Sequence, residues 1–232
     1  MPAPLIAIDG PSGSGKSSTS RGVARRLGLR YVDTGAMYRA MTWWMLTQGV
    51  DVDDPQAVAA RCAEPVIELR DDPADPAVSV DGRDVSAEVR EGAVADAVSR
   101  VAAVPEVRAL LVGNQRAMVE QARADGIGVV MEGRDIGTVV LPEADLKVYL
   151  TADVEARAAR RALEESQRSG SGSIDAAQAN LQSRDALDTT RTVSPLQQAT
   201  DAIAIDGTHF ALDEVIDAVI AAMPPGAGEA VR

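Results

Sequence analysis

Short apolar-rich runs alternate along the chain with longer stretches in which apolar positions recur every three or four residues. Runs of this kind are typical of strands buried on both faces, and the stretches between them have the spacing of amphipathic helices. The alternation predicts an α/β fold with a doubly wound parallel sheet and helices on both faces. We expect the five strands of this sheet at Leu5–Ile8, Tyr31–Val32, Gly128–Met131, Leu146–Leu150 and Ala202–Ile205.

The alternation breaks between the second and third of these strands. There Val66–Leu69 and Val78–Val80 have the composition of short strands, Pro and Asp residues lie between them, and Asp81-Gly82 is a hairpin-turn signal. These features predict a small antiparallel β insert. Further along, the composition of the Ser/Gly-rich stretch 168–173 fits a plain linker or, since arginines flank it, part of a mobile helical lid.

Composition narrows the possible partners. Hydrophobic residues make up 46% of the 232 residues and aromatic residues only 3%, so Ala, Val, Ile, Leu and Met must build the core. The formal net charge of −12 repels nucleic acid and anionic lipid, so we expect neither nucleic acid nor a membrane as a partner. Because no apolar run is long enough to span a membrane and the N-terminus lacks a charged leader, we expect a cytoplasmic protein.

Single residues exclude other kinds of chemistry. Cys62 is the only cysteine, which excludes an internal disulfide and a cysteine metal cluster. His209 is the only histidine and lies in a polar turn, which argues against a catalytic Ser-His or Cys-His pair.

The segment GPSGSGKS carries the strongest chemical signal. It follows the first predicted strand, precedes a helix-like segment and matches the phosphate-binding P-loop, Gly-x-x-x-x-Gly-Lys-Ser; a plain glycine-rich turn is the alternative. Glycines let the backbone N–H groups curl onto phosphate oxygens, and the following helix points its positive N-terminus at the same anion. Lys16 adds a full charge, and the Ser17 hydroxyl can ligate Mg²⁺. The residues expected to hold the nucleoside triphosphate are Gly10, Pro11, Ser12, Gly13, Ser14, Gly15, Lys16, Ser17 and Ser18.

Two further blocks follow predicted strands, where the ligand sites of parallel sheets gather. In YVDTGAMYR, Thr34 and Arg39 lie near a helix N-terminus and could grip a second phosphate; the alternative is a capping Thr and a surface Arg. In MEGRDIGTVV, Arg134 and Asp135 offer a bidentate donor beside a carboxylate acceptor, which suits a base edge or a phosphate. The alternative there is a structural ion pair.

Arginines recur at helical spacing on both sides of the Ser/Gly-rich stretch. Arg157, Arg160 and Arg161 share one helix face before it, and Arg184, Asp188 and Arg191 share one face after it. Charged stripes are usually solvated, salt-bridged surface. In a chain with a P-loop we favour a functional role, because mobile arginines neutralise the charge that phosphoryl transfer spreads over phosphate oxygens.

Together these segments resemble the bacterial cytidylate kinases, which belong to the nucleoside monophosphate kinases. The resemblance covers nearly the full length and runs through GPSGSGKS, DTGAMYR, VDGRDVSAEVR, SRVAAVPEVR, EGRDIGTVV, ARAARR and RDALDTTRTVSPL. It implies transfer of the γ-phosphoryl group of ATP to CMP or dCMP with Mg²⁺, in pyrimidine nucleotide metabolism. Two departures are small: Glu132 stands where the family more often has Asp, and Thr34 stands where Ser is also common.

The resemblance also implies roles for individual residues. Lys16, Arg157, Arg161 and Arg191 would be catalytic, with Arg157 and Arg161 in the closing lid, and Ser17 would bind Mg²⁺ together with nucleotide phosphates. Thr34, Arg39, Arg134 and Arg191 would bind the acceptor phosphate, Ser99, Arg108 and Asp135 would recognise the cytosine edge, and Arg184 and Asp188 would hold the sugar.

The same resemblance implies one kinase unit over residues 1–232. Its core would comprise residues 1–64, 101–152 and 193–223, its nucleoside monophosphate-binding insert residues 65–100 and its lid residues 153–192, with a disordered tail from 224 to 232. We expect a monomer that binds ATP and CMP or dCMP.

Two rival functions remain open at this point. Another small-molecule P-loop kinase, such as a uridylate or shikimate kinase, would share the P-loop but not the antiparallel insert with SRVAAVPEVR. A GTP-dependent binding switch would need a guanine-reading Asn-Lys-x-Asp motif, and the chain's only lysines, Lys16 and Lys147, do not fit one.

Overall fold

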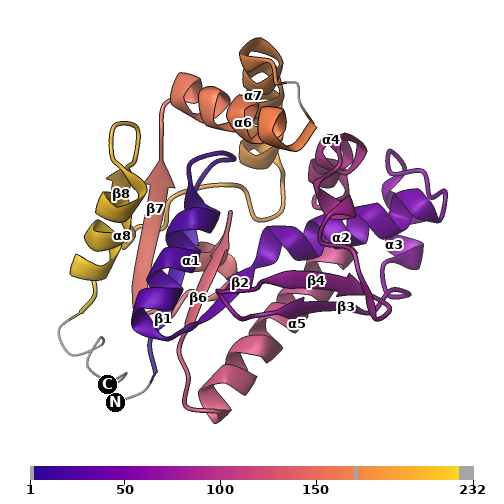
Figure 1. Ribbon diagram of the computed structural model, residues 1–232. Helices are drawn as coiled ribbons and strands as arrows, with labels where there is room; N and C mark the ends of the chain where they lie inside the picture. Colours follow the sequence, from indigo (N-terminus) through magenta and orange to yellow (C-terminus); the bar gives the residue numbers. More distant parts are fainter. Residues whose placement is uncertain (1–2, 170–171, 225–232) are drawn as a thin grey trace.

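A central sheet of five parallel strands organises the molecule (Figure 1). The computed structural model describes residues 3–169 and 172–224, and the strand order is β2-β6-β1-β7-β8. The bounds are β1 Leu5–Asp9, β2 Arg30–Asp33, β6 Val129–Gly133, β7 Leu146–Thr151 and β8 Ile203–Asp206. All five predicted strands are confirmed. Each continues past its apolar run at the carboxyl end, so polar residues and glycine lie at that edge of the sheet.

Helices cover both faces of this sheet, as the alternating side chains of a strand require. Ile6 and Ile8 of β1 pack with α1 (Lys16–Leu27) and α8 (Leu212–Ala221) on one face. Leu5 and Ala7 pack on the other face with α5 (Pro105–Ala124) and a single π-helical turn, η2 (Ile136–Val140). The predicted doubly wound arrangement is therefore confirmed.

The predicted antiparallel insert is also confirmed. Its strands β3 (Ile67–Arg70), β4 (Ala77–Val80) and β5 (Arg83–Asp84) form a separate three-stranded sheet. Asp81 and Gly82 have positive φ angles of 52° and 77°, as the two-residue turn of a hairpin requires.

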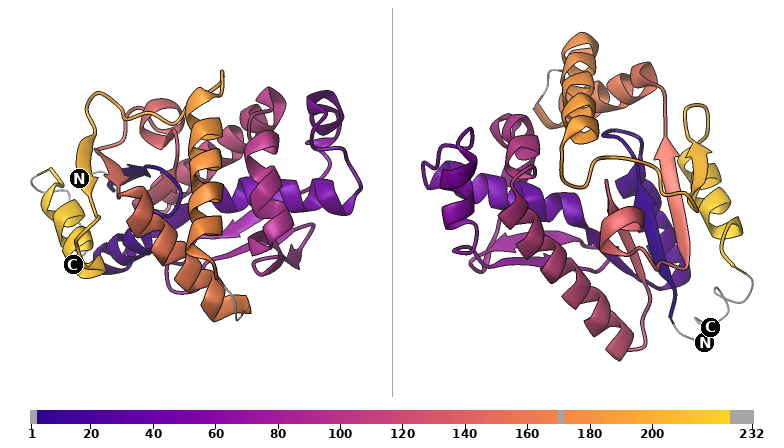
Figure 2. Two further views of the ribbon diagram at one scale, coloured as in Figure 1. Left: turned by 90° about the horizontal axis from the view of Figure 1, so that it is seen from above. Right: turned by 180° about the vertical axis from the view of Figure 1, so that it is seen from behind.

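One apolar cluster joins this insert to the helices around it. Its members come from β3 and β4, from α2 (Thr34–Thr47), α3 (Pro55–Arg61) and α4 (Gly92–Val101), from the short η1 (Glu88–Arg90) and from the start of α5. The insert and these helices therefore form a second packed layer beside the main sheet (Figure 2).

The helices α6 (Val154–Ser169) and α7 (Ile174–Thr190) pack against each other beyond the carboxyl end of β7 (Figure 1). Small residues make much of their contact, in the cluster Ala158, Ala162, Ala177 and Leu181. Part of the Ser/Gly-rich stretch, residues 170–171, and nearly all of the predicted tail, residues 225–232, lie outside the described residues. Within the described ranges no helix is long and apolar enough to cross a membrane.

Candidate active site

A cavity of about 930 Å³ lies between the P-loop, the antiparallel insert and the α6–α7 pair. Its position agrees with the rule that ligands bind outside the carboxyl ends of parallel strands. The P-loop residues from Ser12 to Ser18 line one end. All of the residues that we predicted for the acceptor line the rest: Thr34, Arg39, Ser99, Arg108, Arg134, Asp135, Arg184, Asp188 and Arg191.

The P-loop has the predicted strand–loop–helix form, with β1 ending at Asp9 and α1 beginning at Lys16. Its path requires glycine at two points. A Cβ on Gly10 would lie 2.0 Å from the carbonyl oxygen of Leu150, and Gly15 has a left-handed φ of 92° at the N-cap of α1. The curled backbone and the helix N-terminus therefore meet at the same end of the cavity.

Lys16 is poised to bind an anion. It is only 5% exposed, and its Nζ donates to the carbonyl oxygen of Pro11 at 2.7 Å. Burial and, next in size, the nearby guanidinium of Arg134 lower the pKa of Lys16 to about 7. A phosphate beside Lys16 would reverse this shift, because it stabilises the charged form of the amine.

Asp33, rather than Thr34, caps α2. Its carboxylate accepts from the backbone N–H of Ala36 at 2.9 Å and pairs with Arg39 at 2.8 Å. Thr34 is buried, and its hydroxyl donates to the backbone carbonyl of Glu132 at 2.7 Å. The alternative of a capping Thr34 is therefore wrong, and Arg39 is a partly buried ion-pair partner of Asp33 rather than a free surface residue.

Arg134 and Asp135 are sequence neighbours that pair with different partners. Arg134 Nε donates to Asp188 at 3.0 Å, whereas Asp135 pairs with Arg108 and, at 3.8 Å, with Arg191. An ion pair between Arg134 and Asp135 themselves is thus wrong. Both carboxylates are buried, and the Ser99 hydroxyl reaches Asp188 at 3.4 Å. These bonds join residues that are far apart in the sequence into one charged network.

The arginines of this network crowd one another. Burial and then Arg134 lower the pKa of Arg184 to about 10, and burial and then Arg108 lower the pKa of Arg191. Within the described part of the chain, several of their buried nitrogens have no hydrogen-bond partner: Nε of Arg39, Arg108 and Arg184, and Nη2 of Arg191. Buried donors of this kind need an acceptor. This end of the cavity therefore suits a phosphate group.

The three arginines of α6 lie in three different environments. Arg157 is 7% exposed, donates to the carbonyl oxygen of Ser12 in the P-loop at 2.9 Å and pairs with Asp185 of α7 at 2.6 Å. Arg160 donates to the carbonyl oxygen of Gly207 at 2.7 Å. Arg161 pairs with Glu165 on its own helix at 3.0 Å. The solvated-surface alternative is wrong for Arg157 and describes Arg161 best, although Arg160 and Arg161 both line the cavity.

Other residues of the site had no predicted role. Leu163, Phe210 and Leu212 are apolar, are 61%, 55% and 48% exposed, and line the same cavity as the P-loop. Exposed apolar side chains in such a cavity are a suitable platform for a flat ring. The sequence gave no signal for this group, because Leu163 lies far along the chain from Phe210 and Leu212.

Three residues of the strands β1, β2 and β6 also had no predicted role. Asp9 accepts from the backbone N–H groups of Ile136 and Gly137 at 2.8 and 2.7 Å, and burial raises its pKa to about 6. Tyr31 donates its hydroxyl proton to Glu132 in a buried hydrogen bond. Burial and then the charge of Asp33 raise the pKa of Glu132. Asp9 and Glu132 directly follow predicted strands, where we expect ligand sites, whereas Tyr31 lies within its predicted strand and the sequence gives no signal for it.

Comparison with known proteins points to one family. The family model described as "Cytidylate kinase" matches residues 6–224. A cytidylate kinase of Streptomyces griseus is 53% identical over 216 residues, which cover 93% of this chain and 90% of that protein. One from Nocardia farcinica is 52% identical over 213 residues, covering 92% and 90%. Among solved structures, a gluconokinase from Sinorhizobium meliloti matches 95% of this chain and 91% of that one, with a TM-score of 0.46 and 16% identity.

Proposed function

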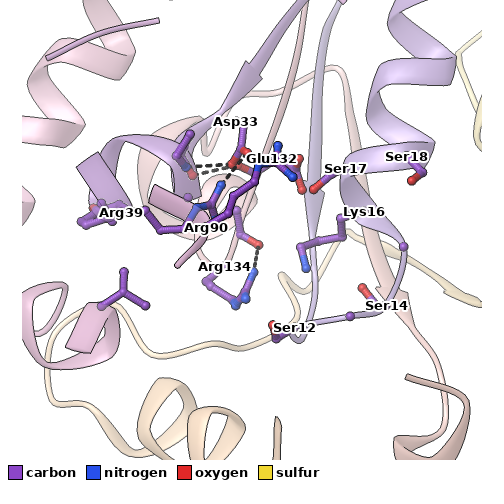
Figure 3. A pocket seen from close by; sticks show the side chains of 18 of the residues that line it. Ser12, Ser14, Lys16, Ser17, Ser18, Asp33, Arg39, Arg90, Glu132 and Arg134 are labelled. Atoms are coloured by element: carbon purple, nitrogen blue, oxygen red, sulfur yellow. Dashed lines mark hydrogen bonds and ion pairs between the residues drawn. The ribbon is translucent and has the colours of Figure 1, made fainter. Parts of the chain in front are cut away.

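Because the chain belongs to the cytidylate kinase family and catalyses the phosphorylation of CMP or dCMP by ATP, we propose how its residues divide this reaction. Family membership excludes the other small-molecule kinase and the GTP-dependent switch. The observation that carries the proposal is the continuous cavity, which has the P-loop at one end and the arginine network at the other (Figure 3).

The P-loop end would hold ATP. Backbone N–H groups from Gly10 to Ser18, except at Pro11, which has none, would surround the β- and γ-phosphates, and Lys16 would add its charge there. The exposed apolar residues Leu163, Phe210 and Leu212 would carry the donor's base, since they line the same cavity and offer apolar surface to it.

The arginine network would hold the acceptor. Thr34, Arg39, Arg134 and Arg191 would bind the phosphate of CMP, and the phosphate would supply the hydrogen-bond acceptor that Arg39 Nε and Arg191 Nη2 need. Ser99, Arg108 and Asp135 would read the cytosine edge, and Arg184 and Asp188 would hold the sugar. In the described structure these side chains pair with one another, so CMP would have to exchange some of those bonds for its own.

The chemistry would need no general base. The attacking group is a phosphate oxygen that is mostly ionised at pH 7, because its second pKa is about 6. Catalysis would therefore consist of alignment and charge stabilisation by Lys16, Arg157, Arg161 and Arg191. The lid, residues 153–192, would close to keep water away from the γ-phosphate until CMP is bound.

Magnesium would enter with ATP. No group of three or more His, Cys, Asp and Glu side chains in the described residues is placed to hold a metal, so the chain alone does not provide a full set of ligands. The Ser17 hydroxyl at the start of α1 and the carboxylate of Glu132 opposite it are the oxygen donors that Mg²⁺ prefers, and ATP phosphates would complete the set. Bound Mg²⁺ would neutralise charge on the transferred phosphoryl group.

All of these residues come from one chain, which supports a monomer as the working unit. The substrates are small cytoplasmic metabolites, so we place the reaction in the cytoplasm. The insert, residues 65–100, would close on CMP while the core, residues 1–64, 101–152 and 193–223, stays in place.

A coupled assay of ADP release tests the acceptor assignment. CMP and dCMP should be phosphorylated at least about tenfold faster than UMP, AMP or shikimate at equal concentration. Asp135 would accept from the 4-amino group of cytosine, which uracil and shikimate lack, and adenine is a larger ring than the one these residues would read. A faster reaction with AMP or UMP would contradict the assignment of the base-reading residues.

A further inference from the structure

Tyr31 lies beside the P-loop and has no part in the reaction as described so far. Its hydroxyl donates to Oε1 of Glu132, and both residues are buried, at 3% and 4% exposure. The strands β2 and β6 are parallel neighbours in which Tyr31 is opposite Val130 and Asp33 is opposite Glu132. Because alternate residues of a strand share a face, Tyr31, Asp33 and Glu132 all point to the face that α1 covers.

Two carboxylates therefore meet on this face, and different groups hold them. Asp33 is bound by the N-terminus of α2 and by Arg39. Glu132 instead points across the gap toward Ser17 (Figure 3), and the charge of Lys16 and hydrogen bonds from Tyr31 and Ser17 favour its ionised form. Only Glu132 is thus turned toward the residue that we propose as a magnesium ligand.

A glutamate in this position needs an external constraint. Its side chain has one more rotatable bond than that of aspartate, so fixing its carboxylate costs more conformational entropy. The Tyr31 ring is held in the apolar cluster between β1, β6 and α1, and it presents its hydroxyl to one carboxylate oxygen from a fixed direction. A rigid donor on Oε1 determines where the other oxygen points.

We propose that Tyr31 is a positioning residue for the donor's metal: it holds Oε1 of Glu132 and so orients the carboxylate toward Ser17 and the Mg²⁺ that accompanies ATP. The inference rests on the proposed magnesium role of Ser17. Tyr31 lines the same cavity and also hydrogen-bonds Ser17, but the effect on the metal that we assign to it is exerted through Glu132. If its hydroxyl served only to satisfy a buried acid, its loss would lower stability without changing how metal affects nucleotide binding.

The test compares ADP binding by calorimetry with excess Mg²⁺ and with EDTA, at a temperature where thermal unfolding curves show each protein to be folded. In the parent protein, Mg²⁺ should tighten ADP binding. Tyr31→Phe keeps the packed ring and should weaken binding of the magnesium complex about tenfold, with metal-free ADP unchanged. The matched control is Tyr149→Phe, which removes a hydroxyl from β7 on the other side of β1 and should change neither affinity.

A double-mutant cycle separates action through Glu132 from a direct effect. Glu132→Gln keeps an oxygen that accepts from Tyr31 but removes the charge, and it should remove most of the magnesium effect by itself. Tyr31→Phe should then add nothing in the Glu132→Gln background. A full additional loss there would overturn the proposal, as would a Tyr31→Phe protein that loses affinity equally with and without metal or keeps the full magnesium effect. A parent protein whose ADP affinity ignores Mg²⁺ would instead refute the magnesium assignment of Ser17, and this inference with it.

Discussion

The two ends of the cavity are built in opposite ways. The ATP end is one continuous loop, Gly10 to Ser17, whose shape follows from local glycines and the helix that comes next. The acceptor end is assembled from α2, α4, α5, α7 and the segment after β6, and its side chains already pair with one another. A site of the first kind can be recognised in a sequence of eight residues, whereas a site of the second kind exists only once the whole fold has formed.

The difference also determines what a mutation removes. At the ATP end most contacts to the phosphates would come from backbone N–H groups, and substitutions leave these groups in place. Lys16 is therefore the side chain whose substitution should remove the most binding interaction there. At the acceptor end each substitution also leaves a buried partner uncompensated. We therefore expect substitutions at the ATP end to lower turnover alone. Substitutions at the acceptor end should also lower CMP affinity and the stability of the fold.

The largest effect is expected for Lys16→Ala. Loss of this charge at the transferred phosphate should lower kcat about 10³-fold. The buried amine already has a pKa lowered to about 7, so its removal should not reduce the unfolding temperature. Steady-state kinetics and thermal unfolding measure both. Lys147→Ala, at the chain's other lysine, is the control: Lys147 pairs with Asp201 away from the cavity, and kcat should be retained. Near-normal turnover of Lys16→Ala would refute the role of Lys16.

A smaller and more selective loss is expected for Asp135→Asn. This variant keeps the shape of the side chain but removes the charge that balances Arg108 and Arg191. CMP affinity should fall about 100-fold, in line with the few kcal/mol that a broken buried ion pair costs, while ADP affinity stays the same. Calorimetry with CMP and with ADP measures the two affinities separately. Asp201→Asn, at an exposed carboxylate that pairs with Lys147, should alter neither affinity. Equal losses for both nucleotides would show that the two ends are not independent.

The smallest effect should separate the two lid arginines. Arg161→Ala should lower kcat about tenfold without changing the urea midpoint, because its ion pairs among the described residues are with Glu164 and Glu165 of its own helix. Arg157→Ala should lower kcat and also shift the midpoint to lower urea, because it breaks buried bonds to Ser12 and Asp185. An unchanged midpoint in Arg157→Ala would mean that α6, α7 and the P-loop are not coupled through this side chain.

The sequence predicts the sheet well because the signals are local. Apolar runs locate all five core strands, and the Asp81-Gly82 turn locates the hairpin of the insert. The P-loop is equally local. Each of these features depends on residues that lie within one turn or one strand of each other, so periodicity and glycine placement are sufficient.

The ion-pair and hydrogen-bond partners of individual side chains could not be predicted in the same way. Helical spacing groups Arg157 with Arg161 but does not tell which of them turns inward to the P-loop. Because Arg134 and Asp135 are adjacent, the sequence suggests an ion pair between them. In the fold β6 ends and the π-helical turn begins at this point, so Arg134 pairs with Asp188 of α7 and Asp135 with Arg108 of α5. Tyr31 and Glu132 meet only because β2 and β6 are neighbours in the sheet, and the strand order does not follow from either segment alone.

The place of β1 in the middle of the sheet has a consequence for synthesis of the protein. On one side Leu5 pairs with Val129, and on the other Ile6 pairs with Leu146. A chain that leaves the ribosome N-terminus first must therefore carry β1 unpaired until β6 and β7 have emerged. The apolar cluster of the insert, drawn from residues between Ala36 and Leu111, can pack earlier from its own members. The loop that holds the phosphates of ATP is among the first parts of the protein to be made and among the last to take its shape.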